Sequence, residues 1–218
     1  MKKGFLLAMG LTMATIGFAQ SEKYVKAMEA KVAAFDTTRN VEALKDLGNA
    51  FERIGEAEKT QWLPYYYAAL AHVNSGYFLT GGQMGGMTQT LDPIAEKADQ
   101  LIAKAEALSK DNSEVYVVKK MIATLRMMGD PMNRYMQYGP LAQQALEAAK
   151  RLNPENPRVY LLEGQDKFYT PEQYGGSKTE AKALLELALK KYQAATPASS
   201  IDPKWGMGTA QYFLSQIK

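Results

Sequence analysis

Apolar residues recur along the chain at the spacing of amphipathic helices. Two stripes lie near the N-terminus, and they consist of Tyr24, Val25, Met28, Val32 and Phe35, and of Val41, Leu44, Leu47, Phe51 and Ile54. Steps of three and four positions place such residues on one helix face. No segment alternates apolar and polar residues over the length of a strand. The pattern therefore predicts an all-α protein that begins with a helical pair.

Three later segments, residues 95–108, 140–152 and 178–192, share one motif. Each carries an alanine, a branched apolar residue four positions on and a second alanine three further, as Ala98/Ile102/Ala105, Ala142/Leu146/Ala149 and Ala181/Leu185/Ala188. Two small residues that flank a large one let a neighbouring helix approach closely. Three copies in order indicate an internal repeat of helical hairpins.

The second copy and the residues after it resemble the tetratricopeptide repeat family. The family's small, large, proline, aromatic and glycine positions are filled by Ala142, Leu146, Ala149, Pro154, Tyr160 and Gly164. The chain departs from the family at Lys110, where a proline is usual, and at Lys120, where a glycine is usual. The resemblance extends over residues 62–192. It implies an α-α solenoid that binds proteins or peptides without catalysis.

Helix boundaries are marked by capping residues that stand before prolines. They predict helix starts at Asp92-Pro93, Asp130-Pro131, Asn156-Pro157, Thr170-Pro171 and Asp202-Pro203. A last apolar stripe consists of Trp205, Ala210, Phe213, Leu214 and Ile217. It predicts a C-terminal helix that caps the solenoid, whose last face would otherwise be exposed.

The repeats are longer than the family's unit of about 34 residues. Ala98, Ala142 and Ala181 are 44 and 39 positions apart. The extra residues fall between the two helices of each pair, in the segments "GYFLTGGQMGGMTQTLDP", "MMGDPMNRYMQYGP" and "FYTPEQYGG". Equivalent turns of a stacked array line up, so we expect the three insertions side by side along one edge.

The insertions are rich in glycine, tyrosine, methionine and glutamine, and two interpretations of them stay open. In the first they form a partner-binding surface, because tyrosine and methionine suit such contacts. Its candidate residues are Gln83, Met84, Met87, Met132, Arg134, Tyr135, Tyr138, Gln173 and Tyr174. In the second, the glycines only let the chain reverse direction and the tyrosines only pack the insertions together.

Residues 1–19 have the pattern of a cleaved secretory signal peptide. Lys2 and Lys3 precede an apolar run, and small residues end it at Ala19. Residues 20–218 then form a single helical-repeat domain. The chain contains no cysteine, so it has neither a disulfide nor a lipid-anchored cysteine. We expect a periplasmic or secreted protein that does not span the membrane.

The charges of the chain argue against a nucleic-acid partner. Lysine and arginine number 26 against 23 aspartates and glutamates, and the two signs alternate along the helix faces. Binding to a phosphate backbone requires clustered basic residues. The alternation is typical of a solvated surface instead.

The sequence offers little material for catalysis. His72 is the only histidine, and we expect it to pack among aromatic residues with a hydrogen bond. Without a cysteine nucleophile or a second histidine, neither a catalytic triad nor a zinc site is indicated. Tyr65, Tyr66 and Tyr67 cover most of one helical turn, so at least one ring should face away from the core, where it could line a concave groove.

These observations favour a protein-binding, peptide-binding or scaffolding module of the cell envelope, with no enzymatic activity, no cofactor and no assigned metal site. Two alternatives stay open. The first is an accessory protein of an envelope transport system that binds a small solute. The second is a Cu(I)-binding protein, because thioethers select Cu(I) and methionines gather near the first two insertions at Met84, Met87, Met127, Met128, Met132 and Met136.

Overall fold

The computed structural model describes residues 15–217, with side chains described from Glu22 onward. The predicted signal peptide, residues 1–19, lies outside the described side chains and stays a prediction. Every regular element between residues 15 and 217 is helical, which confirms the predicted all-α class. None of the helices in this range combines the length and the apolar character that crossing a membrane requires.

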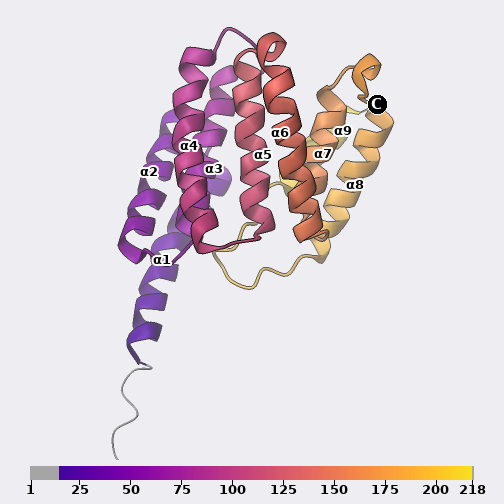
Figure 1. The fold of residues 1–218 in the computed structure, drawn as a ribbon. Coiled ribbons are helices and arrows are strands. Elements are labelled where there is room, and N and C mark those ends of the chain that lie inside the picture. The colour runs from indigo at the N-terminus through magenta and orange to yellow at the C-terminus, as the bar shows by residue number, and fades with distance from the viewer. Residues whose placement is uncertain (1–14, 218) are drawn as a thin grey trace, which may run out of the picture.

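Nine α-helices and one short 3-10 helix make up the described part of the chain. They are α1 (Thr15–Thr37), α2 (Val41–Glu58), α3 (Leu63–Thr80), α4 (Thr88–Leu108), α5 (Ser113–Gly129), α6 (Pro131–Leu152), α7 (Pro157–Tyr169), η1 (Glu172–Tyr174), α8 (Lys178–Ala194) and α9 (Met207–Gln216). Consecutive helices run antiparallel and stack side by side (Figure 1). The result is the predicted α-α solenoid of helical hairpins, with α1 and α2 added before it and α9 closing it.

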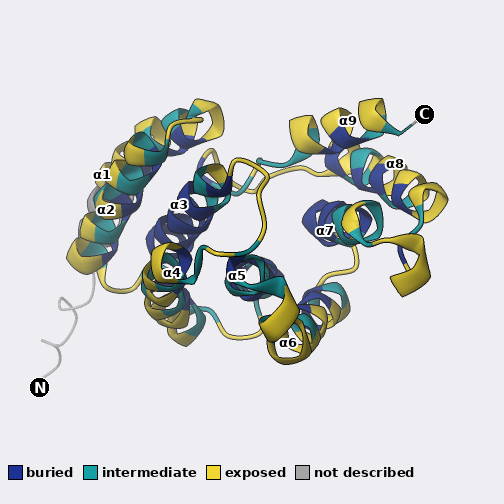
Figure 2. Ribbon diagram, turned by 90° about the horizontal axis from the view of Figure 1, so that it is seen from above, coloured by how far each residue is buried: buried dark blue, intermediate teal, exposed yellow. Residues whose placement is uncertain are grey.

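The apolar stripes form the interior of this stack. Met28 and Phe35 on α1 and Leu44 and Phe51 on α2 are buried, as are all nine residues of the three alanine triplets. Figure 2 shows buried residues concentrated on α3, α5 and α7, while α4, α6 and α8 carry exposed residues on their outer faces. The first helix of each repeat pair therefore lines the inside of the array.

Helix α3 is surrounded by other helices. It packs against α1, α2, α4 and α5, and it contains no charged residue, as expected of a helix without a solvent face. Tyr65, Tyr66 and Tyr67 are all buried. The prediction that one of these rings faces away from the core is therefore wrong, because neighbouring helices cover this part of α3.

Two of the five predicted helix starts are confirmed, at Asp130-Pro131 for α6 and at Asn156-Pro157 for α7, and both caps accept a backbone N–H bond. The other three are wrong. Helix α4 begins before Asp92-Pro93 and takes that proline into its first turns. Thr170-Pro171 ends α7 and leads into η1. Asp202-Pro203 lies in an irregular segment of turns before α9.

The three insertions lie at the same end of the stack, as predicted (Figure 1). The first is a turn between α3 and α4, in which Gly81, Gly82, Gly85 and Gly86 have φ values of 53°, 86°, 91° and 71°. Glycine adopts this left-handed region without steric cost. The second insertion is a helical extension at the start of α6, and the third contains η1.

The first insertion is fixed to the end of α5. The Gly85 N–H donates to the Met128 carbonyl at 2.8 Å, and the Met87 N–H donates to the Gly129 carbonyl at 3.1 Å. Backbone bonds of this kind satisfy polar groups that a turn would otherwise leave unpaired. The glycines thus shape a turn that braces two neighbouring hairpins.

His72 on α3 is buried, and its Nε2 atom has no hydrogen-bond partner among the described residues. The expected hydrogen bond is not made by this atom. Burial lowers the pKa of His72, nearby Lys97 lowers it further, and Glu52 partly offsets both effects. The folded protein therefore favours a neutral imidazole.

We predict that this histidine makes the protein less stable as the pH falls from about 7.5 to about 5.5. The pKa of His72 in the folded state lies below the value of about 6.5 for an unfolded chain, so protons bind the unfolded chain first and favour it. Chemical denaturation at the two pH values measures the effect. His72→Gln should lose less stability over this interval than the unaltered protein, and equal losses would contradict the prediction.

Candidate functional site

The segment between α8 and α9, residues 195–206, returns from the last helical pair to the first, and we call it the strap. It runs along the end of the molecule opposite the insertions (Figure 1). Tyr67 Oη on α3 donates to the Ile201 carbonyl at 3.1 Å, and Ser200 Oγ donates to Glu29 on α1 at 2.6 Å. The strap thus joins the C-terminal helices to α1 and α3.

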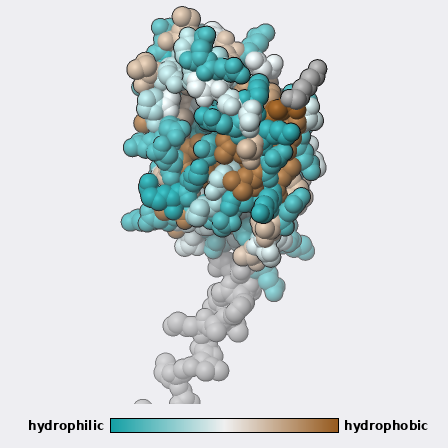
Figure 3. Space-filling model, turned by 90° about the vertical axis from the view of Figure 1, so that its right-hand side faces the viewer, coloured by the Kyte–Doolittle hydropathy of each residue, from teal (hydrophilic) through white to brown (hydrophobic). Residues whose placement is uncertain are grey.

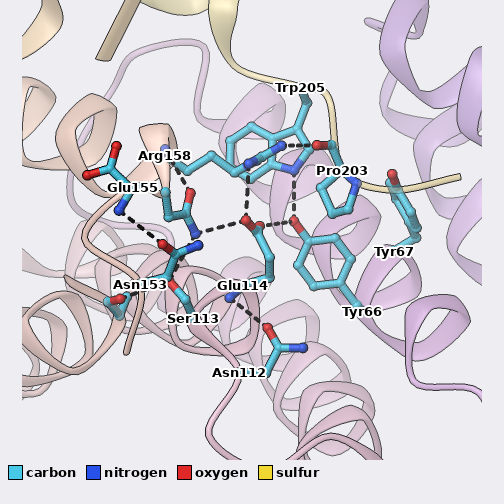
Figure 4. A network of polar contacts seen from close by, with 12 residues as sticks. Tyr66, Tyr67, Asn112, Ser113, Glu114, Asn153, Glu155, Arg158, Pro203 and Trp205 are labelled. Carbon is cyan, nitrogen blue, oxygen red and sulfur yellow. Dashed lines mark hydrogen bonds and ion pairs between the residues drawn. The ribbon is translucent and has the colours of Figure 1, made fainter. Parts of the chain in front are cut away.

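Arg158, the second residue of α7, fastens the strap. Its buried guanidinium donates to Glu114 of α5 at 3.0 Å and to the Pro203 carbonyl, and it lies 5.2 Å from the centroid of the Trp205 ring (Figure 4). Trp205 Nε1 donates to Tyr66 Oη at 2.8 Å, and Tyr66 Oη donates to Glu114 at 2.9 Å. These groups bond to one another, so the network is a structural connection, in which Arg158 Nε is the buried atom without a hydrogen-bond partner among the described residues.

Closer to the insertion end, α7 and α5 meet through side chains. Helix α7 packs chiefly on α8, whereas α5 packs closely on α3, α4 and α6. An ion pair connects the two helices here, with Lys120 Nζ 2.6 Å from Asp166 Oδ1. The Lys120 side chain is 4% exposed and the Asp166 side chain is 44% exposed. The cation is thus buried, while its anionic partner reaches solvent.

Tyr77 of α3 lies beside this ion pair. Its Oη donates to the Met121 carbonyl at 2.7 Å. Burial raises the pKa of the Tyr77 phenol, and the Asp166 carboxylate raises it further, while a hydrogen bond with Thr124 acts in the opposite direction. The phenol therefore stays protonated. Side chains from α3, α5 and α7 converge at this place.

Four aromatic rings lie at the ends of α7 and α9, and they belong to Phe168, Tyr169, Tyr212 and Phe213. Neighbouring ring centroids are 5.1–5.5 Å apart, all in edge-to-face geometry. Tyr169 is 68% exposed and Tyr212 is 59% exposed. Asp166 and Tyr169 are three positions apart, so they lie on one face of α7. Figure 3 shows further apolar side chains exposed over the C-terminal end of the stack.

We call these two groups together the junction surface, and it consists of Tyr77, Lys120, Thr124, Asp166, Phe168, Tyr169, Tyr212 and Phe213. It combines exposed aromatic area with a buried cation. Such a combination suits a flat apolar ligand that carries an acidic group. Within residues 22–217, no group of three or more histidine, aspartate or glutamate side chains is placed to hold a metal ion.

The candidate residues predicted from the insertions are not part of the junction surface, although Phe168 and Tyr169 of that surface begin the third insertion. Most of them are exposed to solvent: Gln83, Met84, Met132, Tyr135, Gln173 and Tyr174. Met87 and Tyr138 are half-buried. The structure brings the first two insertions together through the backbone bonds described above. Whether this edge binds a partner or Cu(I) is not tested by the geometry, and both stay predictions.

Arg134 has a structural contact that the sequence did not reveal. Its guanidinium donates to both carboxylate oxygens of Asp92 on α4, at 2.5 and 2.8 Å, and to the Arg126 carbonyl at 3.2 Å. It also lies over the Tyr138 ring, 5.9 Å from the centroid. A bidentate pair of this kind holds the guanidinium in a fixed orientation, so Arg134 braces α6 against α4.

The junction surface was missed by the sequence analysis, although one signal pointed to it. Lys120 stands where the tetratricopeptide pattern has a glycine, and a long cation at a buried position is costly unless it is paired. Phe168 and Tyr169 begin the third insertion, whereas Asp166 and Tyr212 carry no comparable signal. Their proximity depends on how α9 returns beside α7, which the strap decides.

Comparison with known proteins places this geometry in context. No family model matches the chain, and no curated protein matches it. Among solved structures, the chain is similar to the HusA haemophore from Porphyromonas gingivalis. The two are 32% identical over 89% of this chain and 92% of that chain, with a TM-score of 0.78. The chain belongs to the HusA family.

Membership of the HusA family agrees with the all-helical array of paired helices described above. The name haemophore describes this relative as a binding protein, and no enzyme family matches the chain. The tetratricopeptide resemblance stays a description of the repeat pattern, since no family model supports it. Because this relative is a binding protein, the relevant surfaces of the chain are those that can hold a ligand.

Proposed function

We propose that the protein binds haem or a closely related tetrapyrrole at the junction surface, outside the cytoplasm and without catalysis. The observation that carries the proposal is the similarity to a haemophore over nine-tenths of both chains, 89% and 92%. The coarser expectation from the sequence, a binding protein of the cell envelope, is consistent with it. The finer expectation of a bound peptide is replaced here by a small planar ligand.

The chemistry of the junction surface supports this choice of ligand. A tetrapyrrole is flat and apolar, and its faces can pack against the exposed rings of Tyr169 and Tyr212. The propionates of haem are acidic and complement the Lys120 ammonium. The strap, by contrast, already occupies part of the inner face with the chain's own backbone, which leaves less of that face for an extended peptide.

The side chains that could coordinate iron favour a contact with the porphyrin ring over a bond to the metal. His72 is the only histidine of the chain and is buried against Gly48, whose added Cβ would lie 2.9 Å from the His72 Nε2 atom. It cannot reach a ligand on the surface without disruption of α2 and α3. The exposed phenols of Tyr169 and Tyr212 are able to coordinate iron, as tyrosine does in some haem proteins, but stacking alone does not need the metal.

Fluorescence titration tests the proposal, because Trp205 and Trp62 report on a porphyrin bound nearby. We predict saturable binding of both haem and metal-free protoporphyrin IX. The double variant Tyr169→Ser/Tyr212→Ser should bind both about tenfold more weakly, since each lost aromatic contact is worth about 0.5–1.5 kcal/mol. Its stability should change little, because both rings are exposed.

Tyr174→Ser is the matched control. Tyr174 is 73% exposed and lies in η1, outside the junction surface, so its loss should leave porphyrin affinity unchanged. An absence of saturable binding in the unaltered protein would contradict the proposed function. Equal affinities of the double variant and the unaltered protein would show that the junction surface is not the porphyrin-binding site.

A second candidate function is protein docking at the insertion edge. It is favoured by the exposure of Met132, Tyr135, Met136 and Tyr174, which together present an apolar surface at one end of the molecule. The same titration shows which of the two surfaces holds the porphyrin. If Tyr174→Ser weakens porphyrin binding while the double variant does not, the ligand belongs to the insertion edge and the site assignment must move there.

A further inference from the structure

The Lys120–Asp166 ion pair has an asymmetry that a purely structural bridge does not require. The lysine side chain is almost wholly buried, while nearly half of the aspartate side chain is exposed. Asp166 is the acceptor that the structure places on Lys120 Nζ among the described residues. The aspartate can turn toward water at little cost, but the ammonium cannot, because a buried cation without a partner is strongly unfavourable.

A group that replaces Asp166 beside the Lys120 ammonium has to be an anion. Tyr77 Oη is committed to the Met121 carbonyl, and its pKa is raised by burial, so it supplies no negative charge. Tyr169 lies one helical turn beyond Asp166 on the same face of α7. A ligand stacked on Tyr169 therefore lies on the same face of α7 as the carboxylate that pairs with the buried Lys120.

We propose that Lys120 is the residue that recognises the acidic group of the ligand, and that Asp166 occupies its place when no ligand is bound. This inference rests on the proposed function. A ligand carboxylate exchanges with the Asp166 carboxylate on Lys120 Nζ, and Asp166 turns toward solvent. Asp166 thus satisfies the buried cation in the free protein and competes with the ligand for it.

Because the ligand and Asp166 compete for Lys120, replacing Lys120 and replacing Asp166 should change the affinity for the ligand in opposite directions. Loss of the lysine removes the recognising cation, so Lys120→Met should weaken the binding of protoporphyrin IX roughly tenfold, as expected for a bond to a charged group. Loss of the aspartate charge removes the competitor, so Asp166→Asn should strengthen it about threefold. A bridge with only a structural role would move both variants in the same direction.

Protoporphyrin IX and its dimethyl ester are the two probes, because the ester keeps the macrocycle and lacks the carboxylates. The unaltered protein should prefer the diacid. Lys120→Met should bind the ester as well as the unaltered protein does, and it should lose the preference for the diacid. Lys120→Arg should retain the preference, since the charge is kept.

Lys119→Met is the matched control. Lys119 is the neighbouring lysine on α5 and pairs with Glu106, and both side chains of that pair are partly exposed. Its replacement should leave both affinities unchanged. Circular dichroism and chemical denaturation of each variant show whether it is folded before the titration.

The outcomes separate the two proposals. If both porphyrins bind but the diacid-to-ester ratio is the same in Lys120→Met as in the unaltered protein, the role of Lys120 is overturned and the proposed function stands. If Asp166→Asn weakens the binding of the diacid as Lys120→Met does, the exchange is overturned and the ion pair is structural. If neither porphyrin binds the unaltered protein, both proposals fail.

Discussion

Arg158→Met should lower the free energy of unfolding by about 3–5 kcal/mol, the usual loss when one partner of a buried ion pair is removed. Arg158 is buried and bonds at once to Glu114 and to the strap. Its loss leaves the mostly buried Glu114 carboxylate without a cation. It also frees the strap from α7, so the helices α7 to α9 should exchange backbone amide hydrogens faster. Chemical denaturation and hydrogen exchange measure the two effects.

Two companion variants make the result specific. Lys150→Met removes another ion pair between α6 and α7, with Glu163, but both side chains of that pair are about one-third exposed or more. It should cost less than about 1 kcal/mol. Adding Glu114→Gln to Arg158→Met should recover part of the loss, because the unpaired charge is gone. A loss below about 1 kcal/mol for Arg158→Met alone would show that the strap is held by other contacts.

Gly206→Ala should destabilise the protein by about 2–5 kcal/mol, through backbone strain and overpacking together. Gly206 ends the strap with φ of 112°, a conformation that residues with a side chain rarely adopt. A Cβ atom at this position would lie 1.9 Å from Tyr192 Oη and 3.0 Å from Leu161 Cδ2. The strap could then enter α9 only after both neighbours and its own backbone had shifted.

Gly208→Ala, two residues further, is the matched control for this glycine. No atom lies within 4 Å of a Cβ placed there, and the residue belongs to α9. Alanine favours the helical conformation by up to about 1 kcal/mol over glycine, so this variant should be unchanged or more stable. Thermal or chemical denaturation compares the two. Similar melting of both variants would contradict the account of how the strap ends.

Local periodicity was sufficient to predict the helices. The alanine triplets and the two N-terminal stripes are determined by residues three and four positions apart. All residues of the triplets and most residues of the stripes are buried in the structure. The placement of all insertions at one end followed from the same alternation of antiparallel helices. Predictions that depended on proline were less reliable. Pro93 stands inside α4, beyond the first turn, so a proline that follows a capping residue does not by itself mark the start of a helix.

The junction surface could not be predicted from local pattern. Tyr169 and Phe213 are 44 positions apart in the sequence and become neighbours, with centroids 5.5 Å apart, only because the strap reverses the direction of the chain. Residues 195–206 show no helical or strand period, so the sequence says nothing about their path. Arg158 likewise reads as a solvent-exposed charge at the start of a helix, and its burial follows from the strap lying over it. Lys120 was detectable as a departure from the repeat pattern, and Phe168 and Tyr169 as the start of the third insertion.

The most direct measurement of the central claim is an amide chemical-shift map of the isotope-labelled protein during titration with metal-free protoporphyrin IX. The account predicts that the largest changes lie in α5 around Lys120, at the end of α7 around Asp166 and Tyr169, and in α9 around Phe213. The insertion turn at Met84 and the start of α6 at Met132 should change little. Shifts concentrated at Met84 and Met132, or no saturable shifts at all, would contradict the account.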